Sequence, residues 1–208
     1  MSDLIGELER DAVTELLNVA IGLAASSLSQ LVRDEVRLTV PRIEFLASAA
    51  AAALLDKATG RAESVAVRQN FRSAFSGDIL LVFPERSSLD LVRSMMGDDI
   101  PLDTLTELEQ EALLEVGNII LNACLGSLAN QLGIGIESSL PSYVRGRGAR
   151  ILGSGSVGTA SELIMFLQVD FAVTAKNVQG YLAFVMDIVS AGQFTKAITA
   201  YLDRLMER

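Results

Sequence analysis

The feature that most constrains the fold of this 208-residue chain is an internal repeat. The segment LERDAVTELLN (8–18) matches LEQEALLEVGN (108–118) at an offset of 100 residues. Self-similarity at a fixed spacing predicts repeated structural units. Because two copies are too few for a solenoid, we expect residues 1–100 and 101–208 to form two units of one fused, pseudo-twofold domain.

Each unit is predicted to begin with a long helix. Apolar residues recur at steps of three to five along both segments, which indicates one buried face on each helix. In the first copy these residues are Leu8, Ala12, Leu16, Val19, Leu23 and Leu28, and in the second they are Leu108, Ala112, Val116, Ile119 and Ala123.

Strand-like and helical segments follow each long helix. The predicted strands cover 36–46, 64–75 and 78–84 in the first unit and 162–176 and 181–188 in the second, with closing helices at 87–96 and 190–206. Pro41 interrupts the first of these strands, which is typical of an edge strand or a bent strand. The expected fold class is therefore α+β, with a largely antiparallel sheet and two long helices on its faces.

Charge and composition exclude several kinds of function. The chain has 17 basic and 26 acidic residues, a net charge of −9, so a phosphate backbone is repelled and nucleic acid is not expected as a partner. It has no histidine and one cysteine, Cys124, which excludes Ser-His-Asp and Cys-His catalysis. The same counts exclude zinc sites built on imidazole or paired thiolates, and no metal site of the chain's own is predicted.

Targeting signals are also not predicted. The first residues are acidic where a secretory signal carries basic and then apolar residues. The most apolar stretch is taken as Phe45–Leu55, about half of the ~20 residues that cross a bilayer. We therefore expect a soluble cytoplasmic protein without membrane insertion.

A carboxylate and an amide stand three residues apart in both long helices. These pairs are Glu15 with Asn18 and Glu115 with Asn118. Three steps turn a helix by roughly 300°, so the two side chains of each pair point to one side. Such a pair is ordinary on an exposed helix, but asparagine is a mediocre helix former and here it stands mid-helix twice. Retention in both copies therefore predicts a function.

The repeated pattern includes further residues before and after each Glu-Asn pair. An acid precedes each glutamate by four residues, and a proline follows each asparagine after 22 residues. The resulting pattern, acid-x3-E-x2-N-x22-P, resembles the signature of the CheC family of chemotaxis phosphatases, relatives of CheX and of the flagellar switch phosphatase FliY. It is carried by Asp11, Glu15, Asn18 and Pro41 in the first copy and by Glu111, Glu115, Asn118 and Pro141 in the second.

The resemblance implies hydrolysis of the aspartyl phosphate of a CheY-type response regulator. It assigns Asn18 and Asn118 to orienting the attacking water. It assigns Glu15 and Glu115 to pairing with a cationic group of the regulator. An acyl phosphate passes through a loose transition state, so positioned water suffices without a nucleophile or a histidine. The chain then needs no cofactor of its own, and Mg²⁺ is expected in the regulator.

Two other functions remain open. One is a non-catalytic adaptor that binds the regulator or a CheD-type receptor deamidase, and the other is a structural component of the flagellar switch. Retention of both asparagines favours catalysis.

Three further features are not assigned a function. The G-x-G-x-x-G run at 153–158 is followed by a strand-like segment, so a flexible connection is expected. Arg145, Arg147 and Arg150 are expected to form a solvated basic loop, and Cys124 to be a small buried residue. Residues 47–53 are expected to form a short helix or a linker packed on the sheet.

Overall fold

The computed structural model describes residues 6–32, 35–60, 62–96, 102–153, 162–173 and 176–207. Its helices are α1 (Glu7–Val32), α2 (Ser48–Ala58), α3 (Glu85–Met96), α4 (Leu102–Leu132), α5 (Gly148–Gly153) and α6 (Ile188–Met206). Its strands are β1 (Val36–Ala47), β2 (Ser64–Arg72), β3 (Ser76–Pro84), β4 (Glu137–Ser138), β5 (Ser142–Gly146), β6 (Glu162–Val173) and β7 (Lys176–Asp187).

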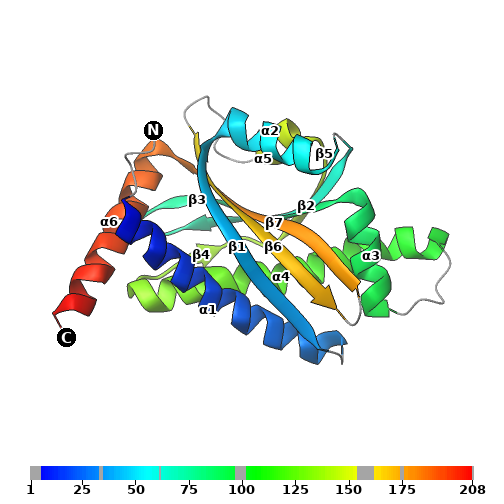
Figure 1. Ribbon diagram of the computed structural model, residues 1–208, viewed down its shortest axis with the longest axis horizontal. Helices are drawn as coiled ribbons and strands as arrows, with labels where there is room; N and C mark the ends of the chain where they lie inside the picture. The colour runs from blue at the N-terminus through cyan, green and yellow to red at the C-terminus, as the bar shows by residue number, and fades with distance from the viewer. Residues whose placement is uncertain are drawn as a thin grey trace.

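The strands form one curled sheet. Its order is β1-β6-β7-β3-β2, with β4 and β5 both pairing with β2, and each of these pairings is antiparallel. Helices α1 and α4 cover one face of the sheet, and α2 and α5 cover the other (Figure 1). The predicted α+β class, the antiparallel sheet and the two long helices are therefore confirmed.

The two halves of the chain exchange their first strands. Strand β1 pairs with β6, where Arg42 lies opposite Gln168, and β5 pairs with β2, where Ser142 lies opposite Arg68. Both pairs keep the offset of 100 residues, and the order helix-strand-helix-strand-strand-helix occurs twice when β4 is set aside. The exchange joins the strands of both halves in one sheet, which is consistent with two fused units. The proposed boundary at residue 100 lies outside the described residues, and the two-unit division stays a prediction.

Proline 41 lies where a proline is tolerated in a sheet. Strand β1 is an edge strand, and its register with β6 shifts between Thr39 and Arg42, so two residues of β1 lie opposite one of β6. Such a bulge needs no ladder hydrogen bond from the proline nitrogen. The predicted edge or bent strand is confirmed.

Side chains of the central strands alternate between two cores, as the pleat requires. The larger core joins the sheet to α1, α4 and α6, and includes Val67, Phe71, Leu81, Phe83, Leu167, Phe171 and Phe184. The smaller core joins it to α2 and α5, and includes Ala51, Leu55, Ala66, Leu80, Ile151, Ile164, Phe166 and Tyr181. Helix α2 thus confirms the short helix expected near 47–53.

The buried face expected on the long helices is wrong in part. On α1, Leu8, Val19 and Leu23 are exposed, and the buried side chains are Ala12, Val13, Leu16, Leu17, Ala20, Ile21, Ala24 and Leu28. On α4, Leu108, Ile119 and Ala123 are only half-buried. The true core side is rotated toward Leu17 and Leu113, because steps of four and five drift away from the period of about 3.6 residues.

Two of the described helical segments are long and apolar enough to cross a membrane by length and composition. They are Glu7–Leu31 and Leu108–Leu132, and 44% and 56% of their most apolar windows are buried. Choosing Phe45–Leu55 as the most apolar stretch overlooked them. Here they are core helices, because their apolar sides pack on the sheet.

The basic segment around Arg145 is exposed, as expected, but it is not a loop. Arg145 lies on β5 and forms ion pairs with Glu63, at 2.9 Å, and with Glu85, while Arg147 pairs with Asp56 at 3.4 Å. The expected loop is wrong because the sequence does not show that β5 pairs with β2, which brings these carboxylates within reach. Of the glycine-rich run, residues 154–158 lie outside the described residues.

A buried ion pair holds α5 to the sheet. Arg68 Nη1 lies 3.4 Å from Asp78 Oδ2, and its Nη2 donates to the carbonyl oxygen of Ile151 in α5. Asn70 Nδ2 donates to the other Asp78 oxygen at 3.2 Å. The pair is almost inaccessible, so neither charge can be hydrated if the other is removed.

We expect Asp78→Ala to lower the free energy of unfolding by about 3–5 kcal/mol, because it removes the carboxylate that lies 3.4 Å from the buried Arg68 guanidinium. Urea unfolding followed by circular dichroism measures the change. The control is Arg37→Ala, which breaks the exposed ion pair with Glu35 and is expected to leave the unfolding midpoint unchanged. Equal effects of the two substitutions would contradict this account.

Candidate functional site

The first predicted pair lies on the outward side of α1. Asp11, Glu15 and Asn18 are all exposed, on the side opposite to the one that packs on the sheet. Two apolar side chains flank the pair, Val19 at 42% exposed and Leu23 at 57%. The helix thus presents a carboxylate and an amide to solvent beside a small apolar surface.

The second predicted pair lies on the outward side of α4. Glu111 and Glu115 are exposed, and Asn118 is half-buried. Helices α1 and α4 lie side by side in one layer and run in opposite directions (Figure 1). Helix α6 contacts the start of α1 and the end of α4, through Thr199 to Glu9 and Arg204 to Leu132. The structure therefore brings together the members of each pair, on two antiparallel helices of one surface.

The motif prolines lie where the first strand of each half joins the sheet. Pro41 is in the bulge of β1, and Pro141 immediately precedes β5. Each stands one residue before the position that pairs with β6 or β2. They mark the strand exchange, so their repetition has a structural explanation.

The repeated glutamate at the start of each long helix has a structural explanation as well. Glu9 accepts a hydrogen bond from Thr199 of α6, and the buried Glu109 accepts one from Ser88 of α3. In each case the partner belongs to the closing helix of the other half of the chain. Identity between the copies thus reflects packing here.

A network of amides beside Asn118, running from the exposed Asn122 to the buried Gln69, was missed by the sequence analysis. Asn122 Nδ2 donates to Asn118 Oδ1 at 2.7 Å. Gln69 of β2, which is buried, directs its Nε2 to Asn122 Oδ1 at 3.1 Å and to the Ser139 carbonyl oxygen at 2.8 Å. The i, i+4 spacing of Asn118 and Asn122 is visible in the sequence, whereas Gln69 is 53 residues away and is found only from the fold.

A glycine brings α4 close to the sheet at this point. A Cβ atom on Gly117 would lie 2.5 Å from Val67 Cγ1, which no side chain can occupy without a shift. The helix backbone therefore approaches β2 directly beside Asn118. This approach puts Gln69, two residues after Val67, within reach of Asn122.

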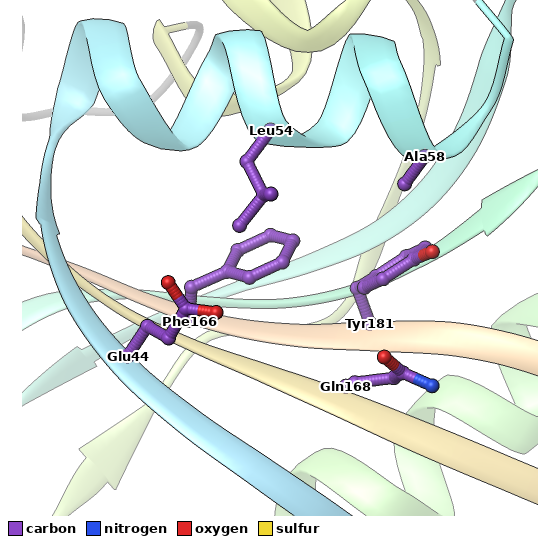
Figure 2. Close-up of a pocket in the computed structure, with 6 residues that line it drawn as sticks. All are labelled: Glu44, Leu54, Ala58, Phe166, Gln168 and Tyr181. Atoms are coloured by element: carbon purple, nitrogen blue, oxygen red, sulfur yellow. The ribbon is translucent and has the colours of Figure 1, made fainter.

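The opposite face of the sheet carries a small cavity of about 100 Å³. It lies between α2 and the sheet and is lined by Glu44, Leu54, Ala58, Phe166, Gln168 and Tyr181 (Figure 2). Phe166 and Tyr181 stack there with ring centroids 5.3 Å apart, and burial, with Asp170 nearby, raises the pKa of Tyr181. No predicted site residue lines this cavity.

Metal-ligating groups do not gather in the part of the chain that the structure describes: three or more of His, Cys, Asp and Glu are nowhere close enough to hold an ion. The one thiol, Cys124, lies on the core side of α4 and is fully buried, which confirms its expected burial. Burial raises its pKa to about 12, so it is neither a ligand nor a nucleophile at neutral pH.

The chain is similar in sequence to known proteins. No family model matches the chain. It is 25% identical over 189 residues to a putative CheY-P phosphatase, CheC1, of Halobacterium salinarum, covering 90% of this chain and 95% of that protein. It is 28% identical over 142 residues to the flagellar motor switch phosphatase FliY of Bacillus subtilis, covering 67% of this chain but only 36% of that protein.

Solved structures share the fold. FliY of Thermotoga maritima superimposes with a TM-score of 0.70 at 18% identity, covering 95% of this chain and 98% of that one. The middle domain of FliM from Vibrio alginolyticus gives a TM-score of 0.62 at 14% identity, covering 89% and 99%. Proteins with this fold include one named as a phosphatase, FliY, and one that is not, FliM. The fold alone therefore does not indicate the activity, which depends on the side chains at the site.

We expect Asn18→Ala and Glu15→Ala to leave the protein folded and at least as stable. Both side chains are exposed, and alanine is the better helix former by a few tenths of a kcal/mol. Thermal unfolding followed by circular dichroism checks this. A large drop in Tm for either variant would mean that the pair is retained for packing.

We expect Cys124 to resist a disulfide reagent at pH 8 in the native protein and to react at once in urea, because the raised pKa and burial keep it a thiol. Absorbance of the released thiolate measures the reaction. The raised pKa of Cys124 also makes the stability of the fold depend on pH. Above the ordinary pKa near 9 only the unfolded chain ionises, so this residue lowers stability as pH rises toward 12. Rapid native labelling would contradict this account.

Proposed function

We propose that this chain hydrolyses the aspartyl phosphate of a CheY-type response regulator, because it shares the fold of FliY and is similar in sequence to CheC1 and FliY. The observation that carries the proposal is a Glu-Asn pair on the outward side of each of two core helices, with Glu15, Asn18 and Glu115 exposed and Asn118 half-buried. The relative named as a CheY-P phosphatase extends over almost the whole chain.

Hydrolysis of an aspartyl phosphate does not require a nucleophile or a histidine from the phosphatase. The acyl phosphate has a good leaving group, and its transition state is loose, so an in-line water held in place gives most of the acceleration. We assign this role to the amides of Asn18 and Asn118. An amide offers both an acceptor for a water proton and a donor for a phosphoryl oxygen. Mg²⁺ belongs to the regulator in this proposal and stabilises charge there.

The carboxylates position the helix. Glu15 and Glu115 stand one turn before the asparagines and would pair with a cationic group beside the regulator's phosphorylated aspartate. Such a pair sets the register of the amide over the phosphorus. Because the chain carries a net charge of −9, long-range attraction to an acidic regulator is not expected. Local contacts, including the exposed Val19 and Leu23, would supply the affinity.

A chemotaxis regulator is a cytoplasmic protein, and we propose the same location for this chain, without nucleic-acid or membrane partners. Asp11 and Glu111 extend the acidic side of each pair and would support its contact with the regulator. An adaptor that binds the regulator or a CheD-type deamidase remains the competing function. Nothing in an adaptor requires an asparagine at the same place in both helices.

The test follows the decay of the phosphorylated regulator with and without the chain, as wild type, Asn18→Ala, Asn118→Ala and the double variant. We expect wild type to accelerate decay and the double variant to leave it at the regulator's own rate, because water is no longer oriented. The matched control is Asn130→Ala, which removes an exposed asparagine from α4 outside the motif and should keep full activity.

Unchanged decay with wild type would overturn the phosphatase proposal. If the wild-type chain still bound the phosphorylated regulator in that case, the adaptor function would take its place. If the double variant retained full activity, catalysis would lie elsewhere on the molecule.

A further inference from the structure

We propose that Asn122 is a positioning residue that orients the Asn118 amide, so that the two Glu-Asn pairs are unequal and the pair on α4 is the one built for fast turnover. This inference rests on the proposed function and names how that site is set up. The evidence for it is a series of hydrogen bonds that runs from the Ser139 carbonyl oxygen, through Gln69 and Asn122, to Asn118.

The direction of the chain is fixed at its far end. The Ser139 carbonyl oxygen can only accept, so the Gln69 atom 2.8 Å from it must be the Nε2 donor. That same nitrogen then donates to Asn122, which therefore turns Oδ1 toward Gln69, at 3.1 Å. Asn122 is left with its Nδ2 facing Asn118, where it donates to Oδ1 at 2.7 Å. Gln69 Nε2 also lies 3.1 Å from Ser138 Oγ. Because a donor faces Asn122 from Gln69, the Nδ2 of Asn122 cannot point there, and this fixes the orientation of the Asn122 and Asn118 amides.

These hydrogen bonds hold the Asn118 amide in one orientation. Its Oδ1 receives Asn122 on one lone pair and keeps the other, and its Nδ2 points away from Asn122 with both protons. A water that must be held in line with a phosphorus atom needs an amide that does not rotate. The network therefore removes, before binding, an ordering cost that the transition state would otherwise carry.

The helix α1 has none of these parts. The residue 100 positions before Asn122 is Gly22, which has no side chain to donate. In the β1–β6 register that mirrors β5–β2, Val169 stands where Gln69 does, and it is buried in the core. Gly117, which lets α4 approach β2, corresponds to Leu17, a fully buried side chain. All three differences concern the support of the asparagine, and among the described residues α1 has no counterpart of Gln69 and Asn122 beside Asn18.

The experiment isolates one pair at a time. In a chain carrying Asn18→Ala only the α4 pair works, and in a chain carrying Asn118→Ala only the α1 pair works. Adding Asn122→Ala to the first is expected to lower kcat roughly tenfold to a hundredfold with KM for the phosphorylated regulator unchanged. Adding Asn122→Ala to the Asn118→Ala chain is expected to leave kcat and KM unchanged. Asn130→Ala is the matched control in both.

Gln69→Leu tests the origin of the effect. It keeps the volume of a buried side chain but cannot donate to Asn122, so kcat of the α4 pair should fall. In the presence of Asn122→Ala it should have no further effect, because both act through one chain of hydrogen bonds. Additive losses would mean that Gln69 acts on folding, and would contradict the network.

The outcomes separate this inference from the proposed function. If no chain accelerates decay, the phosphatase proposal fails. If the Asn118→Ala chain is the faster of the two single variants, or if Asn122→Ala leaves kcat of the α4 pair intact, the phosphatase proposal stands and the positioning role of Asn122 is overturned.

Discussion

The packing of α1 and α4 on one face of the sheet is the interaction on which the rest of the structure depends. Their apolar sides fill the larger core with Leu17, Ile21, Leu113 and Leu121, and burial of that area is the main favourable contribution to folding. Once that side is buried, the opposite side of each helix must face solvent. The Glu-Asn pairs lie there, so the same packing that stabilises the fold presents the candidate site.

Much of this could be predicted from the sequence, for physical reasons. The repeat at an offset of 100 residues predicted two long helices, and the strand-like segments predicted β2, β3, β6 and β7, which pair as two hairpins. Glu15 and Asn18 were predicted to share one side of a helix, and both are exposed on α1. The buried side was wrong in part, since alanines such as Ala20 and Ala24 pack as tightly as leucines but carry a weaker signal.

What could not be predicted depends on contacts between distant segments. The exchange of β1 and β5 between the halves places Arg145 beside Glu63 and Glu85, so a segment that reads as a basic loop is an ion-paired strand. The network behind Asn118 needs Gln69, from another strand, and Gly117, whose missing side chain lets the helix approach. A duplicated motif thus keeps its exposed pair while the support beneath it diverges.

The central claim is that this exposed surface catalyses hydrolysis rather than only binding a regulator. The most direct measurement is phosphate release from a CheY-type regulator that is held in large molar excess over the wild-type chain and phosphorylated from a small-molecule donor. This account predicts that each molecule of the chain releases many equivalents of phosphate above the regulator's own rate. Release limited to that rate, with the regulator nevertheless bound, would contradict it.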